Sequence, residues 1–416
     1  MKSPVIDYLD DLLERTRPLD GGQPADYIPD LKHADIKTFG IALTTVDGRS
    51  YAVGDTDVEF TLQSMSKPFA YAAALSLHGE EVLNEKVGME PSGEAFNELS
   101  LEEGSNRPDN PLINVGALAV HSLILEPHNS REDRVEYLRD FFSRLAGREL
   151  SIDGQIFQSE MDTAERNLAM GHMLKGLGII DLEAHDVVAG YVAQCAVKVN
   201  ICDVAVMGAT LANGGVQPIT GEQVMDADVA RKVLSVMVSA GMYNASGTWF
   251  AEVGIPAKSG VSGGIVGALP SQLGVAAFSP NLDEQGNSVR GIKIFRELSQ
   301  SMGLHVMNSE PYSYQAVRSS KQEGSTLTLQ LQGRVDFSNA EEILDYFENL
   351  ELDFQDLVVD LHRISETNHI GREMLLEGLR RLAEGGVTVK VNDPDNVLKL
   401  EDRQRPHGVE LLRQES

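Results

Sequence analysis

A serine and a lysine three residues apart, Ser64 and Lys67, open a stretch of helix-forming residues in the first quarter of the chain. On a helix, side chains at this spacing share one face, about 5–6 Å apart at Cβ. A serine hydroxyl becomes a useful nucleophile when a neighbouring base takes its proton, and a buried neutral lysine can be that base. The pair therefore has the chemistry needed to attack a carbonyl carbon.

A second motif, far along the chain, strengthens this interpretation. Lys258, Ser259 and Gly260 form a K-S-G triplet on an expected strand, and S-x-x-K followed by K-[ST]-G is typical of active-site-serine enzymes. The S-x-x-K spacing alone also arises by chance, with Ser64 as a helix N-cap beside a solvated lysine. Together, the two motifs favour a serine-dependent acyl-transfer enzyme.

The overall composition limits the partners that this chain can bind. Its 416 residues include 63 acidic and 35 basic ones, and the formal net charge of −28 repels phosphate backbones and anionic membrane surfaces. We therefore expect no nucleic-acid partner and no membrane partner. Apolar residues at 42% and charged residues at 24% are ordinary for globular proteins, so two or three domains with cores are expected.

Cysteine usage and hydropathy indicate the compartment. Cys195 and Cys202 are the only cysteines, too few for a disulfide framework, and we interpret both as buried thiols in a reducing environment. The sequence has no apolar signal core near Met1 and no window of membrane-spanning length. These features predict a cytoplasmic protein.

The spacing of apolar residues predicts strands on both sides of a mostly helical middle. Strands are expected over 38–46 and 50–54, and again between 255 and 279, where glycines interrupt short β-branched runs. The expected helices cover 4–17, 131–146, 160–177, 184–213, 228–242 and 289–302. This order predicts an α+β sandwich with a helical insert.

Composition changes near residues 305–325, where the chain becomes polar and poor in aliphatic residues. We interpret this stretch as a linker, or as a linker with an edge strand. Beyond it, strands (326–332, 356–361, 387–391) alternate with helices (339–350, 372–384). The predicted boundaries are 1–308 for a first domain, 309–322 for the linker and 323–416 for a small α/β domain.

A series of short motifs between residues 20 and 305 resembles the serine-dependent glutaminases. The motifs follow the family's order and include Asp26-Tyr27-Ile28-Pro29, Gln63-Ser64-x-x-Lys67-Pro68, Asn110-Pro111-x-x-Asn114-x-Gly116-Ala117, Phe157-Gln158-Ser159-Glu160, Arg166-Asn167, Tyr191-x-x-x-Cys195, Gly241-Met242-Tyr243 and Pro256-Ala257-Lys258-Ser259-Gly260-Val261. The resemblance implies a β-lactamase/transpeptidase-like antiparallel sheet with a helical subdomain, in a homodimer or homotetramer. It also implies hydrolysis of L-glutamine to L-glutamate and ammonia through a serine acyl-enzyme intermediate.

The resemblance also implies roles for the residues at matching positions. Ser64 would be the nucleophile, Lys67 its activating partner and Tyr243 a proton shuttle. The backbone N–H groups of Ser64 and Val261 would form an oxyanion hole. The residues that would bind the substrate are Tyr27, Asn114, Glu160, Asn167, Tyr191, Tyr243 and Val261.

Elementary chemistry agrees with these roles. Amide hydrolysis passes through a tetrahedral oxyanion, and fixed N–H groups stabilise it by about 3–4 kcal/mol each in comparable sites. The α-ammonium group of glutamine needs an anion, which Glu160 would supply, and the α-carboxylate needs donors. No metal ion or cofactor is required, and the histidines show no metal-ligand spacing. Simpler interpretations stay open: Glu160 as a helix N-terminal acid, Asn114 as a turn former, Tyr27 as a loop aromatic, Tyr191 as core packing and Tyr243 as the close of a helix.

Residues 323–405 resemble the STAS (anti-sigma-factor antagonist-like) domain, for example in Gly333-x-Val335-Asp336 and Gly385-Gly386-Val387. In signalling members of that family, the serine before a helix-opening glycine is phosphorylated. Ile370 stands at that position here, which argues against such a switch. The resemblance implies a module that binds a regulatory partner or forms an oligomer contact, and a passive appendage is the alternative.

Two other functions fit parts of the sequence. A penicillin-recognising hydrolase would share the serine and the fold, but such enzymes normally carry an export signal. A non-catalytic scaffold would leave the C-terminal domain as the working part. Covalent labelling of Ser64 by a glutamine-like electrophile distinguishes a glutaminase from both.

Overall fold

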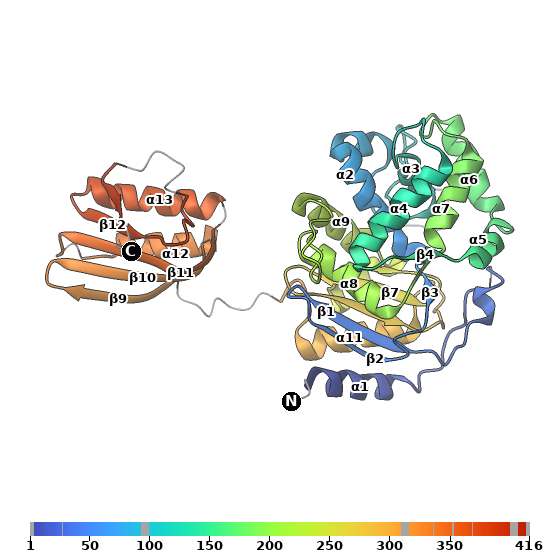
Figure 1. Cartoon of the computed structure of the whole chain (residues 1–416), viewed down its shortest axis with the longest axis horizontal. Helices are drawn as coiled ribbons and strands as arrows, with labels where there is room; N and C mark the ends of the chain where they lie inside the picture. The colour runs from blue at the N-terminus through green and yellow to red at the C-terminus, as the bar shows by residue number, and fades with distance from the viewer. Residues whose placement is uncertain are drawn as a thin grey trace. The chain divides into compact units, whose positions relative to one another are not determined.

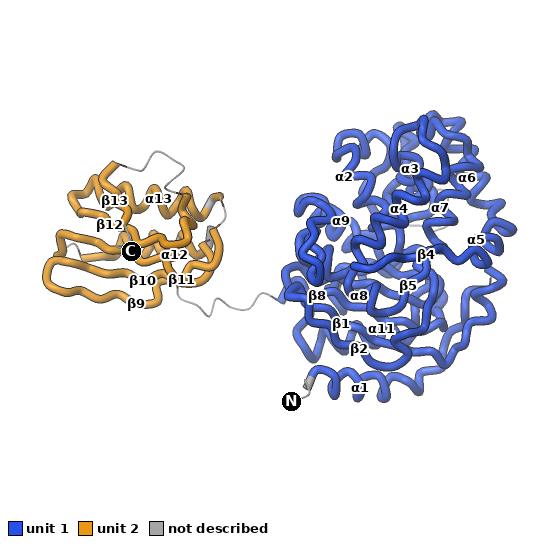
Figure 2. The backbone as a smooth tube through the Cα atoms, viewed as in Figure 1, with its two compact units in different colours: residues 1–308 blue, residues 309–416 orange. Residues whose placement is uncertain are grey.

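The chain folds into two compact units, residues 1–308 and residues 309–416, which Figure 2 colours separately. The computed structural model describes residues 4–26, 28–92, 100–308, 316–335, 337–351, 353–367, 369–399 and 407–412. Each unit has its own cluster of buried apolar side chains. None of the helices within these described ranges is both long and apolar enough to cross a lipid bilayer.

A five-stranded antiparallel sheet forms the base of the first unit, with strand order β2-β1-β8-β7-β6. Its strands are β1 (Gly40–Thr45), β2 (Ser50–Gly54), β6 (Ala257–Ser259), β7 (Gly264–Leu269) and β8 (Leu273–Phe278). The N-terminal hairpin therefore pairs with strands that follow the whole helical middle of the unit. This arrangement confirms the predicted mixed α+β organisation.

The two faces of this sheet bury different cores because side chains alternate along a strand. Ile41 and Leu43 pack in the cluster that faces α1 (Pro4–Thr16) and α11 (Val289–Met302). Ala42 belongs to the larger cluster on the opposite face, where α8 crosses the sheet. Figure 1 shows α1 along the lower edge of the unit and most of the helices above the sheet.

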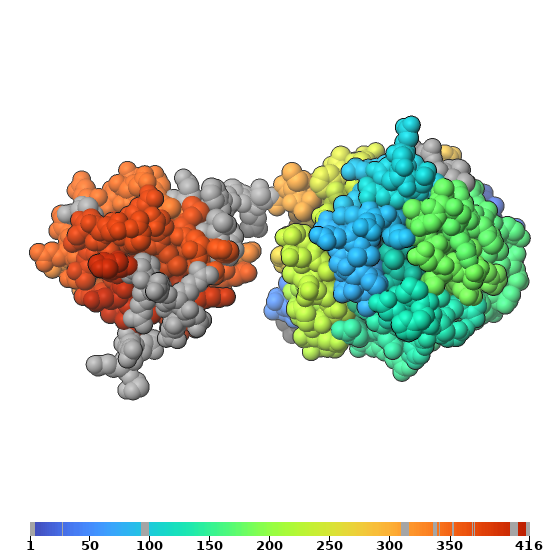
Figure 3. All heavy atoms as spheres, turned by 90° about the horizontal axis from the view of Figure 1, so that it is seen from above, coloured from blue at the N-terminus to red at the C-terminus, as the bar shows by residue number. Residues whose placement is uncertain are grey.

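The helical middle supplies the walls of the unit. Its helices are α2 (Ser66–Lys86), α3 (Asn114–Ser122), α4 (Arg131–Ala146), α5 (Gly154–Met161), α6 (Glu165–Gly176), α7 (Ala184–Cys195), α8 (Ile201–Ala212), α9 (Ala227–Ala240) and α10 (Ser246–Glu252). In the space-filling view, segments coloured from blue through green to yellow-green cover the side of the first unit that faces the reader (Figure 3).

The prediction of one helical region over 184–213 is wrong. The short strand β5 (Val197–Val199) separates α7 from α8, and it pairs with β3 (Phe60–Thr61) and β4 (Ser151–Ile152). Asn200 then starts α8 with a capping box. The expected helix over 160–177 is likewise divided, between the end of α5 and α6. Because the partners of β5 lie far away in the sequence, apolar spacing did not reveal the break.

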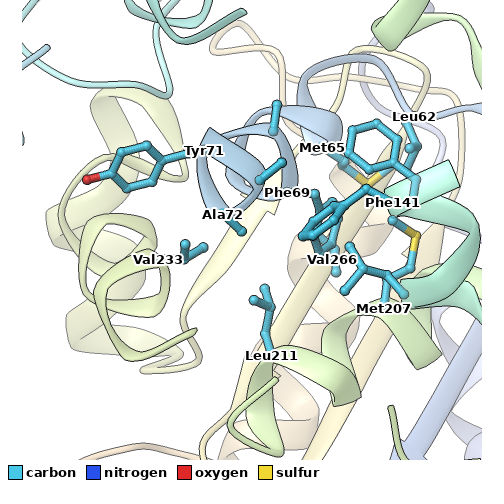
Figure 4. Packing of buried hydrophobic residues seen from close by; sticks show 14 of the residues in the cluster. Leu62, Met65, Phe69, Tyr71, Ala72, Phe141, Met207, Leu211, Val233 and Val266 are labelled. Atoms are coloured by element: carbon cyan, nitrogen blue, oxygen red, sulfur yellow. The ribbon is translucent and has the colours of Figure 1, made fainter. Parts of the chain in front are cut away.

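The N-terminal half of α2 is buried throughout. Every residue from Ser66 to Leu75 is buried. Phe69 packs among Phe141 of α4 and Met207 of α8, as Figure 4 shows. Burial of such side chains contributes about 1.5–3 kcal/mol each. The core therefore holds the beginning of α2, which directly follows the candidate nucleophile Ser64.

The second unit is a five-stranded sheet with strand order β13-β12-β11-β10-β9. The β9–β10 pairing is antiparallel and the other three pairings are parallel. Two helices pack against each other and against the sheet. The elements are β9 (Val317–Glu323), β10 (Thr326–Val335), α12 (Phe337–Glu348), β11 (Asp356–Thr367), α13 (His369–Glu384), β12 (Thr388–Asn392) and β13 (Val409–Leu411).

One boundary needs correction here. The sequence predicts a linker, or a linker with an edge strand, over 309–322; the edge strand β9 begins at Val317, and residues 309–315 lie outside the described residues. Six of the seven residues of β9 are exposed. Exposed polar side chains are typical of edge strands, and the same composition is typical of linkers. Composition alone therefore did not separate the two.

Candidate active site

Ser64 lies in a single 3-10 turn, Gln63–Met65, between β3 and the first residue of α2. The sequence predicted it on the helix itself, and the structure places it directly before the helix. Gln63 adopts a φ of +49°, which is uncommon for a residue with a side chain. Met65, on the other side of Ser64, is fully buried (Figure 4). The core thus fixes the backbone of the candidate nucleophile in a strained turn.

Ser64 lies beside the phenol of Tyr243, and hydrogen bonding from Ser64 lowers the pKa of that phenol against the larger, opposite effect of burial. Tyr243 Oη itself donates to the carbonyl oxygen of Ser259, 3.2 Å away. A hydroxyl has one proton to donate, so Ser64 is the donor and Tyr243 the acceptor in their shared bond. Burial raises the pKa of Tyr243, which keeps the phenol protonated at neutral pH.

Tyr243 reaches this position because the end of α9 lies in close contact with β6. A Cβ atom at Gly241 would stand 1.8 Å from the carbonyl oxygen of Ala257, so the two segments can approach this closely only at a glycine. The chain then turns at Tyr243, whose φ is +54°. The sequence motif Gly241-Met242-Tyr243 therefore has a local structural reason.

Lys67, in the first turn of α2, is 1% exposed. Its Nζ donates to Asn114 Oδ1 at 2.7 Å and to the carbonyl oxygen of Leu112 at 3.3 Å. Burial lowers the pKa of Lys67 to about 8, against the opposing effects of Cys195 and Glu160. An appreciable fraction of this amine is therefore neutral near neutral pH, as a base must be.

Ser64 borders a pocket of about 120 Å³. The pocket collects side chains from α3, α5, α6 and α7 around the 3-10 turn, with three loop residues: Ile28, Thr163 between α5 and α6, and Val261 after β6. The lining residues are Ile28, Gln63, Ser64, Asn114, Glu160, Thr163, Arg166, Asn167, Tyr191 and Val261. A small polar molecule in this pocket would meet hydroxyl, amide and charged groups together.

Glu160 is the carboxylate of this pocket. It lies at the end of α5, only 9% exposed, and its Oε2 accepts a hydrogen bond from Gln63 Nε2 at 3.2 Å. Burial raises the pKa of Glu160 to about 7, while the bond from Gln63 and the charge of Lys67 act in the opposite direction. A ligand cation would restore the ionised form of this buried acid.

Asn114 joins several of the predicted residues. Its Oδ1 accepts from Lys67 Nζ and, at 3.4 Å, from Tyr191 Oη, and its Nδ2 donates to Asn167 Oδ1 at 3.3 Å. Asn114 is the first residue of α3, while Tyr191 and Asn167 come from α7 and α6. These side chains form one connected polar wall beside Ser64.

The structure brings together nearly all the site residues expected from the sequence. Six of them line the pocket: Ser64, Asn114, Glu160, Asn167, Tyr191 and Val261. Lys67 reaches the pocket wall through its hydrogen bond to Asn114, and Tyr243 lies beside Ser64. Tyr27 lies outside the described residues. Sequence reasoning did not assign roles to Gln63 and Arg166, although each stands directly beside an assigned residue in a matched motif.

Comparison with known proteins agrees with this geometry. The family model described as glutaminase matches residues 22–307, which include every residue of the pocket. The chain belongs to the glutaminase family. A glutaminase of Corynebacterium efficiens is 52% identical over 395 residues, covering 95% of this chain and 93% of that protein.

Solved structures of glutaminases have the same fold. The crystal structure of Mglu in its tris and glutamate form aligns with a TM-score of 0.90 and 44% identity, over 96% of this chain and 100% of that one. A probable glutaminase from Bacillus subtilis, complexed with 6-diazo-5-oxo-L-norleucine, has a TM-score of 0.68 and 35% identity, over 74% of this chain and 98% of that one. The first of these structures aligns with almost the whole of this chain, and the second with about three quarters of it. Glutaminases therefore include proteins with and without a counterpart to the remaining quarter.

Proposed function

We propose that this protein hydrolyses L-glutamine to L-glutamate and ammonia, with Ser64 as the nucleophile and an acyl-enzyme as the intermediate. The observation that carries the proposal is that Ser64 borders one small pocket together with the buried carboxylate of Glu160 and with Asn114, which accepts a hydrogen bond from Lys67. Membership in the glutaminase family supports the same substrate and reaction.

Recognition of the substrate follows from the charges of the pocket. The α-ammonium group of glutamine would pair with Glu160, which then ionises fully. The α-carboxylate would lie against Asn114, Asn167 and Tyr191, with Arg166 adding a positive charge at the pocket wall. This placement directs the side-chain amide of glutamine toward Ser64. The assignment of Tyr27 to the substrate stays a prediction.

Acylation begins with attack of Ser64 Oγ on the amide carbon. The serine proton goes to the neutral amine of Lys67, directly or through Tyr243, and the negative charge develops on the amide oxygen. We assign the oxyanion hole to the backbone N–H groups of Ser64 and Val261, both of which line the pocket. Such donors stabilise an oxyanion by about 3–4 kcal/mol each.

Breakdown of the tetrahedral intermediate needs a proton on the leaving nitrogen. The Tyr243 phenol is protonated and in contact with Ser64, so it can supply that proton as the C–N bond breaks. Water then attacks the γ-glutamyl ester of Ser64, with the same groups acting in reverse. The overall balance is one glutamine and one water to one glutamate and one ammonia.

The decisive test is covalent labelling. Incubation with 6-diazo-5-oxo-L-norleucine should add the mass of one reagent molecule less N2, which leaves as the bond to the serine oxygen forms, and peptide mapping should place the adduct on Ser64. Ser64→Ala should show neither the mass gain nor ammonia release from glutamine. Ser76→Ala is the matched control, because Ser76 is on the outer part of α2, bonded to Ala72 O, and should label and react normally. Labelling by a β-lactam in place of the diazo ketone would instead favour a penicillin-recognising hydrolase.

We further infer a β-lactamase/transpeptidase-like arrangement for the first unit and a STAS-like domain for the second. The antiparallel sheet with a helical subdomain, and the alternation of strands and two helices in the second sheet, support these assignments. A chain ending at Asn308 should fold and keep glutamine turnover, since the second unit has its own core. Loss of folding in that variant would contradict the idea of an accessory domain. Homodimer or homotetramer formation stays a prediction.

A further inference from the structure

Lys258 is a buried lysine to which the proposed mechanism gives no role. It lies in β6 and is 0% exposed, although a lysine side chain is rarely buried without a partner. Burial holds the pKa of Lys258 well below its ordinary value, and the positive charge of Lys67 lowers it further. An apolar residue would occupy this position at lower cost, so the amine needs an explanation.

Two contacts of Lys258 connect it with Tyr243, one direct and one through a shared acceptor. Lys258 Nζ lies 3.9 Å from the centroid of the Tyr243 ring. It also donates to the carbonyl oxygen of Ser259 at 2.8 Å. Tyr243 Oη donates to that same carbonyl oxygen at 3.2 Å. The amine and the phenol therefore share one acceptor on one strand, and the amine lies over the ring of the phenol.

This geometry matters most when the phenol loses its proton. A tyrosinate in a buried site is costly because it is removed from water, and burial already raises the pKa of Tyr243. A nearby positive charge in a region of low dielectric lowers that cost. Lys258 is the amine that contacts the ring, whereas the hydrogen bonds of Lys67 go to Leu112 and Asn114.

We propose that Lys258 is a positioning residue for Tyr243, one that holds the phenol toward Ser64 and stabilises the phenolate that forms when Tyr243 protonates the departing ammonia. This inference depends on the proposed glutaminase reaction.

The proposed step balances bond by bond. The Ser64 Oγ–C bond forms, and the C–N bond of the amide breaks. The Tyr243 proton bonds to the leaving nitrogen. The proton that Ser64 gave to Lys67 passes to Lys258 Nζ, because the phenolate forming beside that amine favours its charged form, which burial otherwise disfavours. The phenolate is left next to Lys258, and proton return to Tyr243 completes the cycle.

A leaving-group comparison tests this role. Glutamine releases ammonia, which must be protonated, whereas a γ-glutamyl p-nitrophenyl ester releases a phenolate that leaves without a proton. Lys258→Met should lower kcat for glutamine by about 100-fold, equivalent to about 2.7 kcal/mol, with KM changed less than about threefold. The same variant should hydrolyse the ester within about fivefold of the wild-type rate. A purely structural defect would slow both substrates equally, and that result would overturn the proposal.

Further variants keep the test decisive if Lys258→Met does not fold. Lys258→Gln can still donate to Ser259 O but carries no positive charge, so it should show the same selective loss, and a wild-type rate on glutamine would contradict the proposal.

Tyr243→Phe removes the phenol, so adding Lys258→Met to it should cause no further loss on glutamine. Additive losses in that double variant would also contradict the proposal. Failure of the glutaminase reaction itself would appear separately, as a wild-type chain without glutamine turnover.

Discussion

Gln63 Nε2 lies 3.2 Å from Glu160 Oε2, so the residue beside the candidate nucleophile also holds the carboxylate of the pocket. The same amide nitrogen is 3.3 Å from Thr61 Oγ1, which fixes its orientation. The positive φ of Gln63 directs its side chain to Glu160 while Ser64 turns to Tyr243. One strained residue thus positions the two groups that would contact opposite ends of the substrate.

We predict that Gln63→Leu raises the pKa of Glu160 above about 7, because the hydrogen bond from Gln63 favours the ionised carboxylate. The acidic limb of the kcat/KM profile should therefore move to higher pH. Gln155→Leu is a matched control, since the exposed Gln155 donates to Asp30, and neither residue lines this pocket. An unchanged acidic limb in Gln63→Leu would show that this contact does not tune Glu160.

Glu160→Gln should weaken glutamine binding strongly. Removing one partner of a buried charge pair costs about 2–5 kcal/mol, so KM should rise by about 100-fold, with a smaller effect on kcat. Glutaramic acid, which is glutamine without its α-amino group, provides the internal control. The variant and the wild type should process it at similar rates, and an equal loss on both substrates would argue against an ammonium site at Glu160.

The pH dependence follows from two buried groups. Glu160 must be ionised to bind the ammonium group, and its pKa is about 7, so binding improves as the pH rises through that value. Lys67 must be neutral to accept a proton, and its pKa is about 8, so the basic form also grows with rising pH. Steady-state measurements should therefore show kcat/KM rising between pH 6 and 9. A flat or falling profile over that range would contradict both assignments.

The contact of Gly241 with β6 gives a prediction that combines stability and activity. In Gly241→Ala, the new Cβ would stand 1.8 Å from Ala257 O, so α9 and β6 must move apart. Strain of this kind costs about 1–3 kcal/mol, and the displacement should also move Tyr243 from Ser64 and lower kcat. Gly247→Ala is the control, because its Cβ would meet nothing within 4 Å. Equal melting temperatures and rates for the two variants would show that the close approach is not required.

The sequence predicted the parts of the fold that local patterns determine. The hairpin of β1 and β2, helix α4 and helix α11 all lie where apolar spacing and turn residues placed them. The strand β5 was missed, because three residues between helices carry no local signal of pairing, and the polar composition of β9 left a linker and an edge strand as alternatives. The partners of β5 are distant in the sequence, whereas β9 pairs with β10, the next strand along the chain.

The candidate site divides in the same way. Residue types and spacing identified Ser64 and Lys67, and the family resemblance supplied the more distant residues. Neither revealed that Lys67 donates a hydrogen bond to Asn114, that Gln63 donates one to Glu160, or that Ser64 lies beside the phenol of Tyr243. These contacts join residues from separate helices, so they depend on tertiary packing rather than on spacing along the chain.

The most direct measurement is the capture of the acyl-enzyme during turnover. The full-length protein, mixed with glutamine and quenched in acid within milliseconds, should yield a peptide with a γ-glutamyl ester on Ser64. The same peptide from Ser76→Ala should carry the ester, and that from Ser64→Ala should not. Full glutamine turnover by Ser64→Ala, or an ester on any other residue, would contradict Ser64 as the nucleophile.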